Sequence, residues 1–311
     1  MTLESVSTST PSRPKSTHRP RTRRPRNSVE GRVFNVLRWA TIAVLVLASL
    51  FPFYYMFLLS VRDLSSVVLD PARLWLLPQE LNFQAYMDVL LPVESGGQGF
   101  LSMIGTSATV ALATVALTLL VAVPGAYAVS RLRFIGHRKI GGLFLAVYLF
   151  PAMLLAVPLF VFFTKLGLRG QLWVLIIVYV AQTIAVAIFM LRNYFDTIPV
   201  SIEEAAALDG LGRLQTLRLI ILPLSLPSMM STALFVFMIA WNEFLFALLF
   251  LVEDRNAWTV SLGLSQLSDN LEIPPTLLMA GSVVLTIPII IIFFTTERLL
   301  TGGLTAGAEK G

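Results

Sequence analysis

Six long runs of uncharged, mostly apolar residues restrict this chain to one class of fold. Each is long enough for the roughly 20 residues that a helix needs to cross the hydrocarbon core of a bilayer. The runs are Trp39–Val61, Ser95–Ser130, Ile140–Thr164, Gly170–Leu191, Leu219–Asn242 and Ile273–Thr296. Only 13% of the 311 residues are charged, against about 25% in a soluble domain. We therefore expect an all-α, polytopic membrane protein with six transmembrane helices.

Two of the runs differ from a simple span. The second begins with the glycine-rich stretch Ser95–Gly99, so its helix is expected to start near Phe100. The fifth continues past Glu243 as far as Val252. Four prolines lie within the runs and are expected to kink their helices: Pro52, Pro124, Pro158 and Pro288.

The positive charges predict how the spans are oriented. Eighteen of the 23 lysine and arginine residues fall on the side of the N-terminal tail, the loops 131–139 and 192–218, and the C-terminal tail. Five fall on the opposite side. Cytoplasmic loops carry the excess of lysine and arginine, so both termini are expected in the cytoplasm of a multi-pass cell-membrane protein.

Residues 1–33 are rich in Ser, Thr, Pro and Arg and are expected to form a disordered, basic cytoplasmic tail. Residues 34–311 then form the transmembrane domain. The net charge of +5 comes mainly from this tail, which favours a solvated orientation signal and no nucleic-acid partner. Binding of the tail to anionic lipid or to RNA is the alternative.

A polar, helix-forming segment, about 199–223, separates the fourth and fifth runs. Ser201 and Glu204 have the spacing of a capping box, in which each side chain bonds the other residue's backbone N–H. Ala205–Ala207 favour a helix, and Gly210 is placed to end it in a left-handed turn. A second helical piece, Leu211–Leu222, is expected to enter the next span. A short helix of this kind on the cytoplasmic side is suited to dock on another protein.

The same segment resembles the EAA loop of ABC importer permeases. Glu204-Ala205-Ala206, Gly210 and Ile220-Ile221-Leu222-Pro223 match the pattern E-A-A-x3-G-x9-I-x-L-P at every fixed position. The resemblance implies a cytoplasmic ABC ATPase dimer that carries ATP and Mg, a second homologous permease and an extracytoplasmic solute-binding protein. It assigns these residues to coupling with the ATPase: Glu203, Glu204, Ala205, Ala206, Asp209, Gly210, Leu211 and Pro223.

Two further stretches resemble the sugar-importing, maltose-type permeases. One is Asn242-Glu243-Phe244 within Trp241–Phe246, and the other is the tail Gly303–Ala308. They imply a disaccharide or oligosaccharide as substrate. The polar and aromatic groups available within the spans are the candidates for the substrate path: Asn242, Glu243, Tyr148, Tyr179 and Gln182. A structural role for Glu243, paired near the outer end of its helix, is the alternative.

No motif in the chain predicts catalysis. Phosphate loops, metal-ligand spacings and nucleophile elbows are missing from the sequence, and it contains no cysteine and only two histidines. We expect a non-catalytic subunit that binds no cofactor or metal itself. Transport of another small polar solute, such as a glycerol-phosphate compound, remains an alternative, as does an ion-coupled secondary transporter. The latter is disfavoured because only Glu243 places an acid within a span.

The two longest external segments are Val61–Ser95 and Glu253–Glu272. The first is broken by prolines and carries aromatic residues that suit a membrane interface, so short helices on the outer face are expected. Both segments are acidic overall and could receive a delivery protein, or they could be solvated loops.

Overall fold

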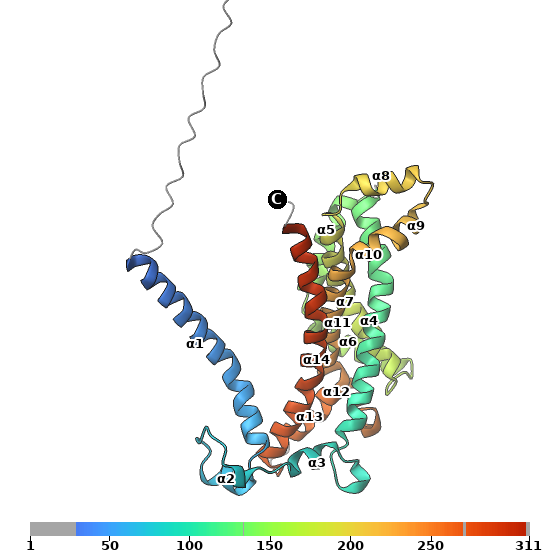
Figure 1. The fold of residues 1–311 in the computed structure, drawn as a ribbon. Helices are drawn as coiled ribbons and strands as arrows, with labels where there is room; N and C mark the ends of the chain where they lie inside the picture. The colour runs from blue at the N-terminus through green and yellow to red at the C-terminus, as the bar shows by residue number, and fades with distance from the viewer. Residues whose placement is uncertain (1–28, 133, 270–271, 309–311) are drawn as a thin grey trace, which may run out of the picture. The chain divides into compact units, whose positions relative to one another are not determined.

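The computed structural model describes residues 29–132, 134–269 and 272–308 (Figure 1). The chain forms two compact units, residues 1–52 and 53–311, and each is described by itself. The first unit contains α1 (Val29–Ser60) as far as Pro52. Because α1 begins at Val29, residues 29–33 of the expected tail are helical; the rest of the tail lies outside the described residues. Apolar side chains such as Val44 and Leu47 are exposed on α1, as expected of a helix that faces lipid.

The second unit contains the last turns of α1 and the remaining helices. These are α2 (Leu64–Leu69), η1 (Pro78–Glu80), α3 (Gln84–Leu90), η2 (Val93–Ser95), α4 (Phe100–Arg131), α5 (His137–Leu149), α6 (Ala152–Lys165), α7 (Leu172–Phe195), α8 (Val200–Leu208), α9 (Arg213–Thr216), η3 (Leu217–Ile221), α10 (Leu222–Leu224), α11 (Leu226–Asn242), α12 (Leu245–Leu251), η4 (Arg255–Ala257), α13 (Val260–Ser268) and α14 (Pro275–Ala308). The described residues contain no strand beyond an isolated antiparallel bridge between Arg62 and Leu81. The all-α prediction is confirmed.

Four helices of the described chain are long and apolar enough to cross a membrane by themselves. They are Gly31–Ser60, Phe100–Arg131, Leu172–Phe195 and Pro275–Glu297. Two further candidates are bent pairs: Gly142–Leu149 with Ala152–Lys165, bent by 79°, and Arg213–Leu224 with Leu226–Asn242, bent by 78°. Counting each pair as one span gives the six that were predicted, and the expected start of the second at Phe100 is correct.

The third and fifth runs do not form single straight helices, because each is broken at a sharp bend. The third breaks at Phe150–Pro151: a residue before proline is driven out of the helical region, and Phe150 has φ −72° and ψ 125°. The proline singled out earlier, Pro158, lies inside α6 without ending it. The fifth turns at Ser225, just before Leu226-Pro227, and ends at Glu243 instead of continuing to Val252.

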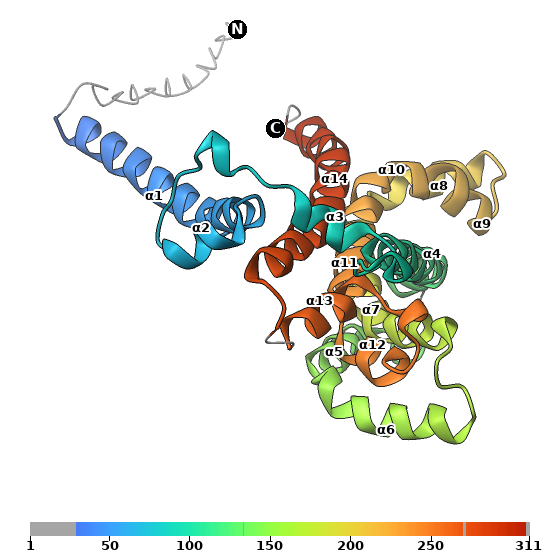
Figure 2. The same cartoon turned by 90° about the horizontal axis from the view of Figure 1, so that it is seen from below.

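Small residues let α4 and α7 pack closely along their length. Thr114, Thr118 and Ala122 of α4 and Thr183 and Ala187 of α7 are all buried. The Thr118 and Thr183 hydroxyl oxygens lie 3.1 Å apart and share a hydrogen bond. Packing of this kind, with hydroxyl groups bonded between helices, is typical of membrane bundles. Figure 2 shows α7 and α11 at the centre of this unit, with α6 on its rim.

The two ends of this unit differ in their connections. Figure 1 shows α8 and α9 at its upper end and α3 and α13 at its lower end. The short helices expected in Val61–Ser95 are present as α2, η1, α3 and η2. In the other segment that was expected to be external, Val260 and Leu262 of α13 are fully buried, so α13 is part of the packed core rather than a solvated loop.

Candidate functional site

The helix α8 begins two residues earlier than the capping box predicts, at Val200 instead of Ile202. Pro199, with φ −57° and ψ 131°, is the N-cap, and its carbonyl accepts from the N–H of Ile202 at 3.2 Å. Ser201 therefore lies within the first turn and makes no side-chain cap bond. The predicted capping box is wrong, because the proline, whose φ is preset for the chain to enter a helix, takes over the start. Glu204 is left exposed on the surface of α8.

The end of α8 is the left-handed turn that the sequence predicts. Gly210 has φ +83°, and its N–H donates to the Ala207 carbonyl at 3.1 Å. The N–H of Leu211 reaches back to the Ala206 carbonyl at 3.0 Å. These two bonds satisfy carbonyl groups that the helix end would leave open. A Cβ added at Gly210 would meet no atom within 4 Å, so the backbone conformation alone requires glycine here.

Glu203 connects α8 to the end of α4. Its Oε1 lies 2.5 Å from Arg131 Nε, and its Oε2 accepts from the Tyr127 hydroxyl at 2.9 Å. The side chains of Arg131 and Glu203 are only 11% and 14% exposed. We call Tyr127, Arg131 and Glu203 the Arg131 clamp. Glu203 was predicted to take part in coupling to the ATPase, and in this chain its carboxylate is bonded to Tyr127 and Arg131.

Arg131 also binds the connection between α7 and α8. Its NH2 group donates to the carbonyl oxygens of Phe195 and Ile198, each at 2.8 Å. Beside it, the Ser130 hydroxyl donates to Asp196 at 2.5 Å. One guanidinium group therefore holds the ends of α4 and α7 and the start of α8 together. Sequence reasoning missed Arg131 and Tyr127, and the only signal for them was a basic residue at the end of an apolar run.

The surface of α8 and α9 that faces away from the bundle is exposed and partly apolar. Leu208 is 90% exposed and Leu214 is 77% exposed. Glu204 and Asp209 are exposed in the same loop. A cavity of about 250 Å³ lies between α8 and α4, and both Glu204 and Leu211 line it. Of the predicted coupling residues, Ala205 and Gly210 are also exposed, Ala206 is buried and Pro223 lies apart in α10.

The connection from α9 to α11 is irregular. Leu217–Ile221 form a π-helical turn, with Leu217 and Ile221 buried, and α10 follows directly. The chain then bends by 78° at Ser225. The buried Ser225 hydroxyl has no hydrogen-bond partner within the described residues. Such π-helical turns are frequent where helices have a function that requires a distortion.

Among the path candidates, the structure brings Glu243 and Tyr179 together. The Tyr179 hydroxyl donates to Glu243 Oε2 at 2.6 Å, and Tyr179 is fully buried. The N–H of Phe246 donates to both carboxylate oxygens of Glu243, at 3.0 and 3.1 Å. Glu243 therefore satisfies the open N–H groups at the start of α12. This geometry supports the structural alternative for Glu243.

Tyr148 and Gln182 line a second location, a cavity of about 720 Å³ between α5–α6 and α7–α11. Its wall is otherwise mostly apolar and includes Leu155, Phe235 and Phe246. The Nε2 of Gln182 is buried, and no group in the described part of the chain accepts from it.

Asn242 lies apart from the other candidates, on a cavity of about 470 Å³. Its Nδ2 donates to the Met238 carbonyl at 2.9 Å. The same cavity is lined by four serines: Ser261, Ser265, Ser268 and Ser282. The five path candidates therefore occupy three places rather than one. No cluster of three or more His, Cys, Asp or Glu that could hold a metal occurs in the described ranges.

Comparison with known proteins identifies the family of this chain. A family model described as "Binding-protein-dependent transport system inner membrane component" matches residues 123–303, which include α8 and α11. The chain is 38% identical over 271 residues to the inner membrane ABC transporter permease protein YcjP of Escherichia coli (strain K12), covering 87% of this chain and 94% of that protein. It is 37% identical over 270 residues to the trehalose/maltose transport system permease protein MalG of Thermococcus litoralis, covering 86% and 94%.

A solved structure shows the same fold. It is the crystal structure of a bacterial ABC transporter involved in the import of the acidic polysaccharide alginate. One of its chains matches with a TM-score of 0.74 and 27% identity, covering 87% of this chain and 98% of that one. The chain belongs to the family of inner membrane components of binding-protein-dependent transport systems.

Proposed function

We propose that this chain is the permease subunit of an ATP-driven importer and that its substrate is a disaccharide or oligosaccharide. The observation that carries the proposal is the geometry of α8, which turns one face outward and fixes the opposite face to the bundle through the Arg131 clamp. A helix held in this way can pass the movement of a partner to the spans as a rigid body. The matched family and the EAA pattern support the same role.

The outward face of α8 is the proposed contact with a cytoplasmic ABC ATPase dimer. Glu204 and Asp209 offer charges there, and the exposed Leu208 and Leu214 offer apolar area. An exposed leucine of this kind is costly in water, at about 25 cal/mol for each Å² of apolar surface. ATP and Mg would be bound by that ATPase and not by this chain. The basic loops beside α8 favour a cytoplasmic location for α8 and for both termini.

The proposed substrate path follows the cavity lined by Gln182 and Tyr148. Sugars require a few polar groups in an otherwise apolar wall. The Gln182 amide is buried without an acceptor, and a sugar hydroxyl would supply one. Phe246 lines the same cavity, so Glu243 and Tyr179 would act by positioning α12 rather than by touching the sugar. Asn242 would line a separate part of the path.

A sugar is favoured by the names of the relatives. The Thermococcus litoralis protein is a trehalose/maltose permease, and the solved transporter imports alginate. A second homologous permease and an extracytoplasmic solute-binding protein would complete the complex.

The test is copurification followed by transport. Tagged chain extracted in mild detergent should bring down an ATPase and a second permease. The complex in sealed vesicles should take up radiolabelled maltose or trehalose only with Mg-ATP and the solute-binding protein. Uptake by this chain alone, driven by an ion gradient without ATP, would exclude the proposal.

A further inference from the structure

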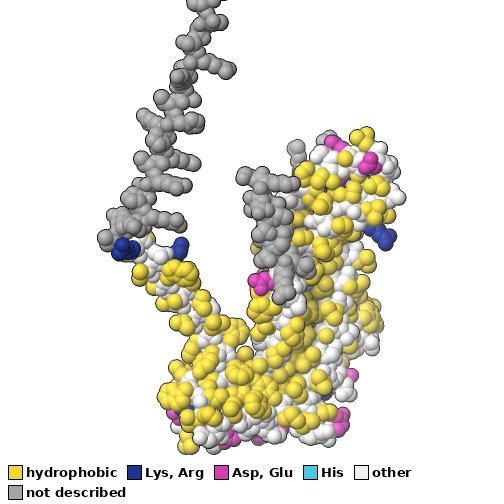
Figure 3. Space-filling model, in the orientation of Figure 1, with side chains coloured by type: hydrophobic (Ala, Val, Ile, Leu, Met, Phe, Trp, Pro, Cys, Tyr) yellow, Lys and Arg dark blue, Asp and Glu magenta, His cyan; other side chains and the backbone are white. Residues whose placement is uncertain are grey.

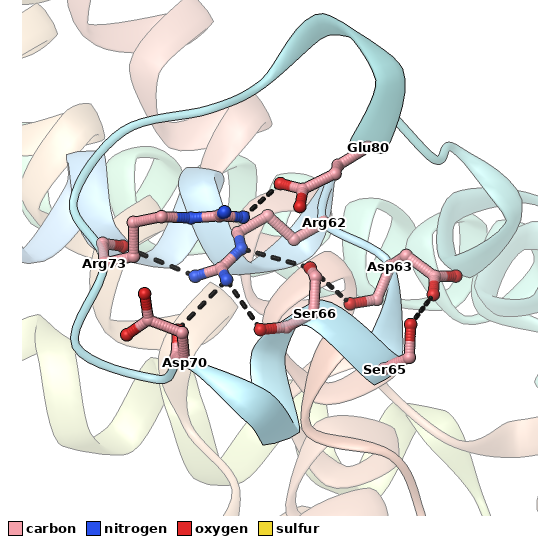
Figure 4. Close-up of polar contacts among 7 residues, drawn as sticks. All are labelled: Arg62, Asp63, Ser65, Ser66, Asp70, Arg73 and Glu80. Carbon is pink, nitrogen blue, oxygen red and sulfur yellow. Dashed lines mark hydrogen bonds and ion pairs between the residues drawn. The ribbon is translucent and has the colours of Figure 1, made fainter.

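The external segment after α1 is folded around one buried arginine. Arg62 is only 2% exposed. Its NH2 donates to the carbonyl oxygens of Ser66 at 2.7 Å and Asp70 at 3.0 Å, and its NH1 donates to the Arg73 carbonyl at 3.3 Å (Figure 4). The positive charge is thus surrounded by backbone oxygens of the loop that follows it. Those carbonyl groups and the guanidinium group no longer require water.

The other charges near Arg62 are also largely satisfied within the segment. Arg73 forms an ion pair with Glu80 (Figure 4). Hydrogen bonds from Ser65 and from Asn82 lower the pKa of the Asp63 carboxyl below its usual value. The carboxylate of Asp70, in contrast, is exposed at the end of α2. Within residues 64–77, Asp70 is therefore the one charged residue that is exposed. It must stay at a polar depth, as must the neighbouring Asp63, which its lowered pKa keeps charged.

Two tyrosines hold the segment against the end of α1. The Tyr54 hydroxyl donates to the Leu74 carbonyl, and the Tyr55 hydroxyl donates to the Pro71 carbonyl at 2.8 Å. Tyr54 lies six residues before Ser60, the last residue of α1. At a rise of about 1.5 Å per residue, that is about 9 Å along the helix. The stretch Pro71–Leu74 therefore returns to the level of the last turns of the span instead of extending away from it.

The side chains that this fold turns outward are apolar. Leu69 is 85% exposed, Val68 71% and Trp75 62%. Figure 3 shows apolar side chains covering the region of α2, with acidic side chains along the lower edge. Phe53 and Phe57, in the part of α1 that belongs to the second unit, are also half exposed. A contiguous apolar surface of this kind marks contact with a membrane or with another protein.

We propose that residues 64–77 form an interfacial membrane anchor, which lies at the boundary of lipid headgroups and acyl chains in the leaflet where α1 ends. Lipid is the favoured occupant because the apolar surface continues that of the span and the tyrosine bonds hold it at the depth of the span. Tryptophan and tyrosine are the residues that prefer this layer. The buried Arg62 and the Arg73–Glu80 pair remove the charges that would oppose it, and Asp70 limits the depth to the headgroups. The anchor is independent of the transported substrate.

Spin labelling tests the anchor, and a chain without native cysteine is suited to it. Leu69→Cys and Trp75→Cys are labelled in the complex as purified, reconstituted in liposomes. Collision accessibility to oxygen and to a water-soluble nickel chelate is measured by electron paramagnetic resonance. Ile287→Cys, on the exposed surface of α14, is the lipid control, and Glu94→Cys, exposed in η2, is the water control.

The anchor predicts that both labels fall between the two controls, with higher oxygen accessibility and lower nickel accessibility than Glu94→Cys but less extreme values than Ile287→Cys. The double variant Tyr54→Phe/Tyr55→Phe should shift the Trp75→Cys label toward the water control, while Tyr194→Phe, which removes a tyrosine-to-carbonyl bond elsewhere, should not. Labels that match Glu94 would overturn the proposal. Low accessibility to both reagents would overturn it as well, because it would show that protein and not lipid covers the segment.

Discussion

The Arg131 clamp gives the sharpest test of how α8 is attached. Glu203→Gln keeps the shape of the side chain but removes the charge that faces Arg131. Arg131 would keep its bonds to the carbonyl oxygens of Phe195 and Ile198, so the loss should fall below the 3–5 kcal/mol typical of a broken buried pair. We expect a loss of about 2 kcal/mol in the free energy of unfolding. Arg131→Gln also loses the carbonyl bonds, and about 3 kcal/mol is expected.

The assay is a double-mutant cycle on the purified chain. Unfolding by sodium dodecyl sulfate is followed by circular dichroism for the wild type, Glu203→Gln, Arg131→Gln and the double variant. Contact between the two side chains predicts that the double variant loses less than the sum of the single ones, by about 1–2 kcal/mol. Glu204→Gln is the matched control, since it removes a neighbouring charge that is exposed. It should leave the stability of the isolated chain unchanged.

The outcome that refutes the clamp is additivity. If Glu203 instead contacts the ATPase, as the EAA pattern implied, its substitution should leave the isolated chain stable and weaken assembly. The effects of Glu203→Gln and Arg131→Gln would then be independent. The cycle and a copurification experiment therefore separate a bond within the chain from a bond to a partner.

Three further predictions concern the exposed loop and the path. Gly210→Leu should lower the free energy of unfolding by about 1–2 kcal/mol, the cost of a left-handed backbone for a residue with a side chain. It should also reduce ATP-driven uptake while the chain still inserts in the membrane, and Gly210→Asn should have a milder effect. Equal uptake by both variants and the wild type would contradict this prediction. Glu204→Gln should lower the yield of copurified ATPase, and an unchanged yield would remove Glu204 from the interface. Glu243→Leu should lower the thermal stability in detergent, because it removes the group that caps the start of α12. Asn242→Leu should lower uptake while the thermal stability is retained. If Asn242→Leu lowers the stability and Glu243→Leu lowers only uptake, both assignments are refuted.

The spans could be predicted because a membrane leaves few alternatives. A helix satisfies every backbone polar group without water, so long uncharged runs locate the spans, and a glycine-rich stretch locates the start at Phe100. The turn at Gly210 was also predictable, since its φ of +83° is open to few residues other than glycine. These features depend on neighbours in the sequence.

Features that depend on distant neighbours could not be predicted. Arg131 and Glu203 are 72 residues apart, and no local pattern indicates that they meet. The position of the bend at Ser225 could not be predicted either, because Pro223 and Pro227 allow a bend at several positions. The capping box was predicted wrongly for a local reason, because Pro199, two residues before Ser201, is the N-cap of α8 in its place.

The two sides of α8 are built differently, and this bears on how movement would reach the spans. Before α8, the guanidinium group of Arg131 fixes the helix to the ends of α4 and α7 by several short hydrogen bonds. After α8, the chain passes through a left-handed turn, a π-helical turn and a bend of 78° before it reaches α11. Displacement of α8 should therefore move α4 and α7 with it as one body, while the arm 211–225 absorbs part of the change before α11. The cavity lined by Gln182 of α7 and Phe235 of α11 lies between these two parts, so a difference in their movement would change its width.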